Sequence, residues 1–126
     1  MKRFFLALLL LIFCFSIAIY GFHCLEKSSF QLIEMLEKAG NMIFEGETKK
    51  AENALRDIEK AWEKNRLAFN VFLDHTTLDT LDSSLPALFE ILKSGSEEQA
   101  FEEIQKSIAV LKDIVEEQKI NIGNIL

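Results

Sequence analysis

The sequence is poor in the residues that form disulfide frameworks and metal sites, with two cysteines and two histidines among 126 residues. Both cysteines, Cys14 and Cys24, lie near the N-terminus, so the rest of the chain has no disulfide framework. On one helix they would lie about 15 Å apart, beyond the roughly 7 Å that a disulfide bridges. Cys24 is therefore expected to be a free thiol, with a disulfide between the Cys24 residues of two copies in a homodimer as the alternative.

The sequence also lacks a Gly-rich phosphate-binding loop, a nucleophile elbow and a paired cysteine motif. We therefore expect no enzyme activity and no cofactor. The length allows one domain, and no stretch before residue 120 alternates apolar and polar residues as a strand would. These features favour an all-α protein.

Positive charge is scarce after the first 22 residues. Of the 14 Lys and Arg residues, Lys2 and Arg3 precede residue 23, which leaves 12 against all 20 Asp and Glu residues. Residues 67–92 contain no Lys or Arg at all. Nucleic acid and anionic lipid headgroups are bound by clustered positive charge. The sequence therefore excludes nucleic acid as a partner and makes an anionic membrane surface a poor one.

An uncharged run of 19 residues, 4–22, follows the basic start. As a helix it would be about 28 Å long, close to the hydrocarbon thickness of a bilayer. Thirteen of these residues are Leu, Ile or Phe, and at roughly −0.3 to −0.6 kcal/mol each they favour insertion by about 4 to 8 kcal/mol. We predict a transmembrane anchor over residues 1–22 and an extracytoplasmic domain over residues 23–126.

A cleaved signal peptide is the alternative interpretation of this run, with Ser16 and Ala18 as a small-x-small cleavage site. Cleavage there would leave Ile19, Tyr20 and Phe22 at an apolar new N-terminus, which favours an uncleaved anchor. The basic start is expected to remain in the cytoplasm. The prediction is a single-pass protein of the cell membrane with a cytoplasmic N-terminus and an extracytoplasmic C-terminal domain.

Helical periodicity is strong after the anchor, with apolar residues recurring at steps of three and four in four segments. Two boundaries are clear, at EGET (45–48) and KSGSEEQ (93–99). Gly46 and Gly95 suit helix C-caps there, and Ser96 with Gln99 suits a capping box. The apolar seams are Leu25, Leu32, Leu36, Ala39 and Ile43; Ala51, Leu55, Ile58, Trp62, Asn65, Phe69 and Phe72; Leu78, Leu81, Leu85, Leu88 and Leu92; and Phe101, Ile104, Ile108, Leu111, Val115 and Gln118.

We therefore expect a small antiparallel bundle of about four helices in two hairpins. A faint repeat supports this organisation, and either duplication of one hairpin or the shared requirements of capped amphipathic helices would produce it. The repeat relates Gly46, Ala51, Leu55 and Trp62 to Gly95, Ala100, Ile104 and Leu111.

The uncharged tail, residues 120–126, is expected to dock on the bundle, with a membrane surface or a partner as alternatives.

The stretch DHTTLDTLDSS (74–84) concentrates carboxylates and hydroxyls in an otherwise apolar, helical chain. The apolar stripe of the preceding helix ends there and resumes displaced by about 100° around the axis. A helix break within the first four residues of the stretch accounts for the displacement, with Thr76 and Asp79 as a capping pair. Pro86 is unfavourable inside a helix, so it moves the expected start of the next helix to residues 83–84 or implies a bend.

A metal site is the sharper interpretation of the same stretch, because His75, Asp79 and Asp82 step by four and three along a helix. Residues seven apart lie about 10.5 Å apart along the axis, too far for three ligands about 2 Å from one ion. Glu90 or another helix would have to supply further ligands. No metal is therefore predicted, and His75, Asp79, Asp82 and Glu90 are the candidates if a divalent cation binds.

Several features occur together along the chain: a basic start, one apolar span, a Trp before a Phe-rich helix, then His75, Leu78, Asp79 and Leu85, and a final Asn124, Ile125 and Leu126. This layout resembles an uncharacterised family, a domain of unknown function, of small single-span membrane-anchored helical proteins from spore-forming Firmicutes. The resemblance implies a bacterial cell-envelope location but no activity or catalytic residue. Relatives are often encoded beside a second uncharacterised membrane protein family, which implies a membrane complex.

The sequence thus favours a membrane-tethered, non-enzymatic helical interaction or scaffold module of the bacterial cell envelope. Its expected partners are the lipid bilayer, through residues 4–22, and another membrane or envelope protein. The alternative is a divalent-cation-dependent sensor or enzyme that uses His75, Asp79, Asp82 and Glu90.

Overall fold

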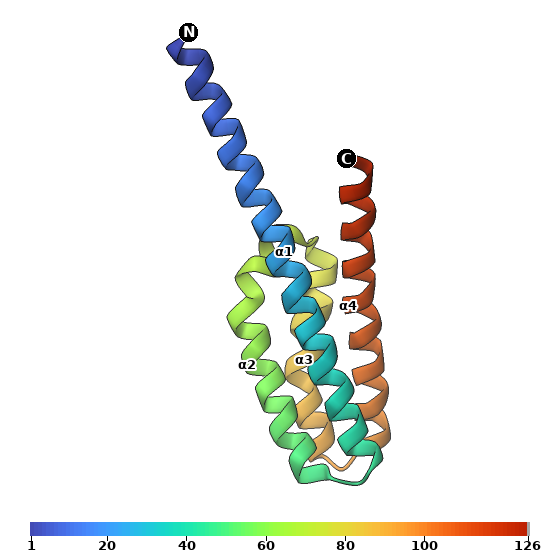
Figure 1. The fold of residues 1–126 in the computed structure, drawn as a ribbon. Helices are drawn as coiled ribbons and strands as arrows, with labels where there is room; N and C mark the ends of the chain where they lie inside the picture. The colour runs from blue at the N-terminus through green and yellow to red at the C-terminus, as the bar shows by residue number, and fades with distance from the viewer. Residues whose placement is uncertain (126) are drawn as a thin grey trace.

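Four α-helices and the turns between them make up the part of the chain that the structure describes (Figure 1). The computed structural model describes the backbone of residues 1–125 and the side chains of residues 1–117 and of Lys119. The helices are α1 (Lys2–Phe44), α2 (Thr48–Phe72), α3 (His75–Lys93) and α4 (Glu97–Ile125). No strand occurs among the described residues, and the prediction of an all-α chain is confirmed.

The helices form an up-down-up-down bundle (Figure 1). α1 packs against α2 and α4, and α3 packs against the same two helices. Within the described part of the chain, the diagonal pairs α1–α3 and α2–α4 have no backbone contact. The predicted antiparallel bundle of four helices in two hairpins is therefore confirmed.

Helix α1 is the longest element, with 43 residues. Its N-terminal half projects beyond the other helices, and its C-terminal half is one of the four bundle helices (Figure 1). The sequence placed a domain boundary after residue 22, but the helix runs across this point without interruption. Gly21 lies next to this point, but unlike Gly46 and Gly95 it does not adopt the positive φ angle of a helix C-cap, so the helix continues.

The core follows the predicted seams closely. The seams of α1 and α3 are buried in full, and in α2 and α4 only Asn65, Phe72 and Phe101 are half-buried. Full burial of a Leu or Ile side chain contributes roughly 1.5 to 3 kcal/mol, so these stripes are the main source of stability. The side chain of Gln118, the last residue of the α4 seam, lies outside the described ones. The same holds for the side chains of the tail, residues 120–126, whose docking was predicted.

The turns α1–α2 and α3–α4 have the same backbone geometry. Gly46 and Gly95 have φ angles of +81° and +89°, a conformation that glycine adopts without strain. In the first turn, Gly46 N donates to Ile43 O and Glu47 N donates to Met42 O, and the corresponding pair of hydrogen bonds recurs in the second turn. Both turns are therefore Schellman motifs, and the two predicted C-cap glycines are confirmed.

Helix α4 begins at Glu97, directly after Ser96, as the predicted capping position requires. The Ala100 N–H donates to the Ser96 carbonyl oxygen at 2.9 Å. Among the described side-chain hydrogen bonds, however, none comes from Ser96 or Gln99, so the reciprocal capping box is not formed. Instead, the Thr48 hydroxyl at the start of α2 donates to the Glu97 carboxylate at 3.0 Å and links the two turns.

The two hairpins repeat one pattern of burial. Ala51 and Leu55 in α2 are buried, and so are Ala100 and Ile104, which stand 49 residues later in α4. The hydrogen-bonded residues Thr48 and Glu97 are separated by the same 49 residues. The same spacing relates four buried residues of the α1 seam to four of the α3 seam: Leu32, Leu36, Ala39 and Ile43 to Leu81, Leu85, Leu88 and Leu92. Each hairpin therefore covers the apolar stripe of the other.

The polar stretch 74–84 contains a break followed by a helix start, as predicted. α2 ends at Phe72, Leu73 and Asp74 have extended ψ angles of 153° and 158°, and α3 begins at His75. The predicted capping pair Thr76–Asp79 is wrong, because α3 begins upstream of it with Asp74 at the N-cap. The Thr76 carbonyl oxygen instead accepts a hydrogen bond from the Thr80 hydroxyl at 2.9 Å.

Pro86 lies in the interior of α3, so the expected helix start at residues 83–84 is wrong, and the alternative, a bend at Pro86, stays a prediction. A proline there removes one hydrogen bond and costs about 3 kcal/mol. Leu78 and Leu81 precede it in the same helix and are buried, and together they contribute roughly 3 to 6 kcal/mol. Burial of these two leucines offsets the cost of the proline, so the helix begins at His75, more than two turns before the expected start.

Replacing Gly46 by Ala is expected to lower the free energy of unfolding by about 1 to 2 kcal/mol, because an L side chain is disfavoured at positive φ. The fluorescence of Trp62, the sole and buried Trp, reports unfolding of the full chain in mild detergent. Glu45→Ala, at the neighbouring position with φ of −81°, is the matched control and should change stability by less than about 0.5 kcal/mol. Equal losses in the two variants would contradict the turn geometry.

Candidate functional site

The four residues proposed as cation ligands all lie on α3, but they do not converge. His75, Asp79 and Glu90 are exposed, whereas Asp82 is half-buried against α2. Among the described residues, no group of three or more His, Cys, Asp or Glu side chains is arranged to hold a metal ion. Asp82 is the one candidate with a defined set of partners.

Asp82 is held by two side chains of α2. Trp62 Nε1–H donates to Asp82 Oδ1 at 2.7 Å. Arg66 donates through Nε to Oδ1 at 2.9 Å and through Nη2 to Oδ2 at 2.8 Å, a bidentate pairing of guanidinium and carboxylate. Trp62 and Arg66 stand four residues apart on one face of α2, so both reach the same carboxylate. This cluster, Trp62–Arg66–Asp82, fixes α2 against α3.

The cluster keeps Asp82 ionised. Hydrogen bonding from Arg66 lowers the pKa of Asp82, burial opposes this effect, and the Trp62 hydrogen bond lowers the pKa further. Asp82 in turn raises the pKa of Arg66, through the same hydrogen bonds first and through charge second. A divalent cation would have to displace Arg66 to reach this carboxylate. The arrangement is therefore that of an interhelical clamp.

The two contacts of the clamp differ in strength. The side chain of Arg66 is 57% exposed and that of Asp82 is 24% exposed, so solvent screens the ion pair. Trp62 is buried, and removal of Asp82 would leave its indole N–H without its acceptor in the structure. The hydrogen bond to the indole is therefore the more costly one to lose.

Sequence reasoning missed this clamp, although it identified Trp62 as a core residue and Asp82 as a polar candidate. A signal was present: Arg66 is the last basic residue before the segment 67–92, which has none, and it lies one helical turn after the sole Trp. The Trp62 indole N–H and the Arg66 guanidinium are two hydrogen-bond donors one turn apart on α2, and the next helix, α3, is acidic. Together they predict that one carboxylate of α3 accepts from both. Which acidic residue accepts depends on the helix register, and the sequence does not supply it.

Asn65, the polar residue within the α2 seam, has a comparable local role against α1. Its Nδ2 donates to the Ala61 carbonyl oxygen at 2.9 Å, and its Oδ1 accepts from the Ser28 hydroxyl at 3.3 Å. These bonds satisfy a half-buried amide between two helices. They also fix the register of the α1–α2 pair, because Ser28 lies opposite Asn65.

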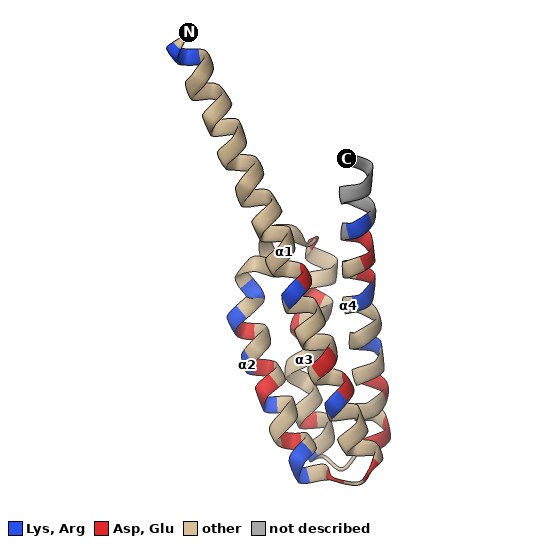
Figure 2. Ribbon diagram, in the orientation of Figure 1, with Lys and Arg blue, Asp and Glu red and all other residues tan. Residues whose placement is uncertain are grey.

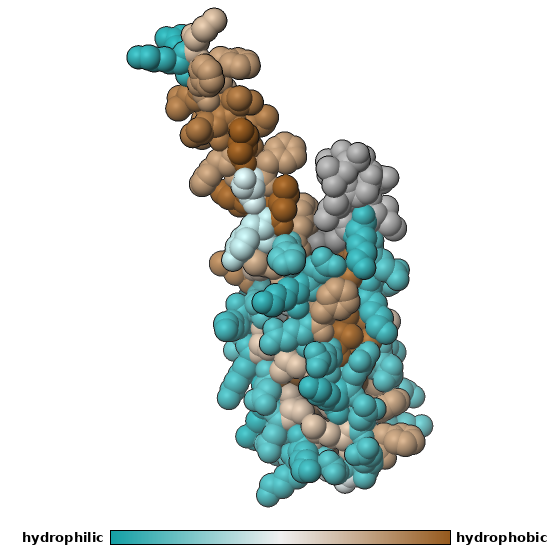
Figure 3. Space-filling view, viewed as in Figure 1, coloured by the Kyte–Doolittle hydropathy of each residue, from teal (hydrophilic) through white to brown (hydrophobic). Residues whose placement is uncertain are grey.

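The projecting half of α1 is the second candidate functional feature, after the Trp62–Arg66–Asp82 clamp. Its large apolar side chains are exposed, and it carries no charge between its tip and the bundle (Figure 2). Figure 3 shows most of this segment as an apolar surface, with paler residues toward the bundle, whose visible face is mostly hydrophilic. An 18-residue stretch of α1 is long and apolar enough to cross a membrane, and none of it is buried. A signal sequence has the same length and composition.

The junction between the projecting half and the bundle is tightly packed. The Phe72 ring lies 5.0 Å from the Phe22 ring, and a Cβ atom added at Gly21 would overlap Phe72. A side chain at this point of α1 would therefore require the Phe72 ring to move. Cys24, half-buried just beyond the junction, is a free thiol, and its disulfide with a second copy stays a prediction.

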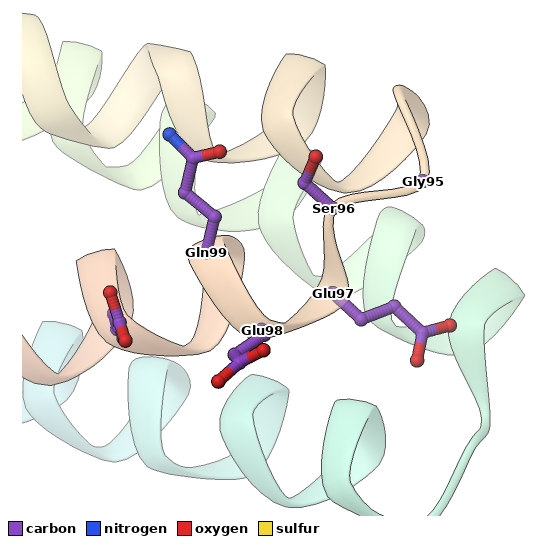
Figure 4. A pocket seen from close by; sticks show the side chains of 6 residues that line it. Gly95, Ser96, Glu97, Glu98 and Gln99 are labelled. Atoms are coloured by element: carbon purple, nitrogen blue, oxygen red, sulfur yellow. The ribbon is translucent and has the colours of Figure 1, made fainter.

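The opposite end of the bundle carries a shallow, open depression at the start of α4 (Figure 4). Backbone and side chains of the α3–α4 turn form it, and several of its side chains are carboxylates open to solvent. No described residue encloses it, so its geometry resembles an ordinary helix start more than a ligand site. Its lining consists of Gly95, Ser96, Glu97, Glu98, Gln99 and Glu102.

Replacing Asp82 by Ala is expected to lower the free energy of unfolding by about 2 to 3 kcal/mol, because it leaves the Trp62 indole N–H and Arg66 without their acceptor. Asp82→Asn should lose only about 1 kcal/mol, since a carboxamide oxygen still accepts from Trp62. Thermal unfolding of the full chain in mild detergent, followed by far-UV circular dichroism, measures both. Asp79→Ala is the matched exposed control, and an equal loss in that variant would argue against the clamp.

The pH dependence of stability provides a second readout of the same clamp. The folded pKa of Asp82 lies below its ordinary value of 3.8, so its contribution is complete above that pH and is lost as the pH falls through the lowered value. The difference in stability between the native chain and Asp82→Asn should therefore be constant near neutral pH and should shrink below about pH 4. A difference that stays constant down to the lowest measurable pH would contradict this assignment.

Comparison with known proteins places the chain in a family. Residues 19–125 match the family model described as Domain of unknown function (DUF4363). The matched segment covers the bundle half of α1 and all of α2, α3 and α4. The chain matches no curated protein and no solved structure. The chain therefore belongs to the DUF4363 family, whose function is unknown.

Proposed function

We propose that this protein is a membrane-tethered helical interaction module of the bacterial cell envelope, with no catalytic role. In this proposal residues 4–22 cross the lipid bilayer and the bundle lies on the extracytoplasmic side. The observation that carries the proposal is the projecting half of α1, which is apolar all round, exposed and continuous with a bundle helix.

The physical reason to propose a membrane is that so large an apolar segment would be unfavourably exposed to water without one. Monomeric soluble proteins rarely expose contiguous apolar patches larger than a few hundred Å². Here an entire 18-residue apolar stretch is unburied by the rest of the described chain. A bilayer supplies the missing apolar environment, and a run of about 28 Å fits its hydrocarbon thickness.

The charge distribution supports the proposed orientation. Lys2 and Arg3 lie at the tip of the projecting segment, and the bundle carries all 20 acidic residues against 12 basic ones (Figure 2). Short basic flanks favour the cytoplasmic side of a membrane. This orientation leaves the bundle outside the cytoplasm, where another membrane or envelope protein would bind it.

The proposal requires the full chain to remain in the membrane with Lys38 outside and Lys2 inside. Single cysteines at these exposed positions, Lys38→Cys and Lys2→Cys, are made in a chain with Cys14→Ser and Cys24→Ser. In intact cells a membrane-impermeant maleimide should label Lys38→Cys alone, and both sites should react after lysis. The intact mass of the membrane-bound chain is the control for cleavage. Labelling of neither site before lysis, or release of a shortened chain into the medium, would contradict the proposal.

The interaction role requires a partner that recognises the bundle itself. Cross-linking in intact membranes, followed by extraction in mild detergent, should recover a defined complex with one membrane or envelope protein. A chimera that keeps residues 1–28 and replaces the rest by an unrelated helical bundle should lose this complex. Recovery of the single chain alone, or of the same complex with the chimera, would count against an interaction module.

A further inference from the structure

The last two turns of α2 carry no charge. Residues 67–73 read LAFNVFL and contain no Asp, Glu, Lys or Arg. Leu67 and Val71 stand four residues apart, so they share one face of the helix, and they are 76% and 70% exposed. The charged residues that flank this stretch are Arg66, which lies against Asp82 on α3, and Asp74, which is exposed at the start of α3. Leu67 and Val71 therefore form an exposed apolar pair beside the turn to α3.

Contacts with α1 place this face beside the end of the apolar run. Phe72 packs on Phe22 and against Gly21, and Asn65 accepts a hydrogen bond from Ser28. Because α1 and α2 are antiparallel, this register puts Val71 at about the level of residue 22. Leu67 lies one turn further from the span, by about 6 Å.

Bilayer dimensions then give the depth of the two side chains. The hydrocarbon layer is about 30 Å thick and the whole bilayer about 40 to 45 Å, so each headgroup layer is roughly 5 to 7 Å deep. The run 4–22 fills the hydrocarbon layer by itself, at about 28 Å. Val71 and Leu67, at the level of its outer end and about 6 Å beyond, fall within the headgroup layer.

Exposed apolar residues are ordinary when they occur singly on a surface. Phe44 is such a residue, 86% exposed at the turn between α1 and α2, far from the projecting segment (Figure 1). Leu67 and Val71 differ because they form a pair on one face and lie at the level where the apolar run of α1 ends. This level is what identifies lipid as the occupant of the face.

We propose that the end of α2 lies in the headgroup layer of the membrane that holds residues 4–22, with Leu67 and Val71 against lipid. This inference rests on the proposed anchoring. The bundle then has two membrane contacts, the span and the end of α2, which fix its orientation on the bilayer. A single span alone would leave the span and the bundle free to tilt together, as one rigid body, in the bilayer.

Spin-label accessibility in vesicles tests the depth of each residue directly. The full chain with Cys14→Ser and Cys24→Ser receives one cysteine at a time, as Val71→Cys, Leu67→Cys, Phe44→Cys or Leu10→Cys. Each variant is labelled and reconstituted into neutral phosphatidylcholine vesicles, where relaxation by oxygen, which partitions into lipid, is compared with relaxation by a water-soluble nickel complex. Phe44→Cys is the matched control, because it is an equally exposed apolar position far from the span.

We expect the ratio of oxygen to nickel accessibility to fall in the order Leu10, Val71, Leu67, Phe44, with the middle two clearly above Phe44. Values at Val71 and Leu67 equal to that at Phe44, while Leu10 stays in lipid, would overturn the inference and leave the anchor intact. A water-exposed Leu10 would overturn the anchor itself. Spin–spin broadening at Val71 that disappears on dilution with unlabelled chain would assign the face to a second copy and would also overturn the inference.

Discussion

Helix α1 has two halves with different surroundings: one half is apolar on every side, and the other packs in the bundle along one stripe. Residues 4–20 present apolar side chains on every side, whereas from Leu25 onward one stripe faces the core and the rest faces solvent. The helix is unbroken, so the position of its apolar half also sets the position and rotation of the bundle. Gly21 lies at the changeover, and the absence of a side chain there lets Phe72 of α2 approach the helix. The junction thus couples the two halves through packing as well as through the backbone.

The bundle is held differently at its two ends. At the end distant from the projecting segment, two Schellman turns at Gly46 and Gly95 fix the chain reversals through backbone hydrogen bonds, and Thr48 links them to each other. Toward the junction, the α2–α3 connection consists of two extended residues, and hydrogen bonds between side chains hold the helices together. There the Trp62–Arg66–Asp82 clamp joins α2 to α3, and Asn65 joins α2 to α1. Rigid placement of the end next to the projecting segment therefore depends on few polar contacts.

Local patterns predicted most of this fold. The seams on α1 to α4 follow from helical periodicity, and Gly46 and Gly95 identify their turns because positive φ is a local requirement. The prediction failed at Pro86, where a local cost of about 3 kcal/mol was outweighed by leucine burial that only the packed bundle supplies. Asp82 was misread for the same reason, since its donors Trp62 and Arg66 come from another helix and depend on the register between them.

The central claim is that one rigid helix joins the bilayer to the bundle. Spin labels at Leu10→Cys and Lys38→Cys, two exposed positions of α1, measure this directly in the full chain reconstituted into a bilayer. Twenty-eight residues of unbroken helix separate them by about 42 Å at 1.5 Å per residue. The structure predicts one narrow distance distribution centred there. A broad distribution, or a distance shorter by a turn or more, would show a bend or hinge between the two halves and would contradict the account.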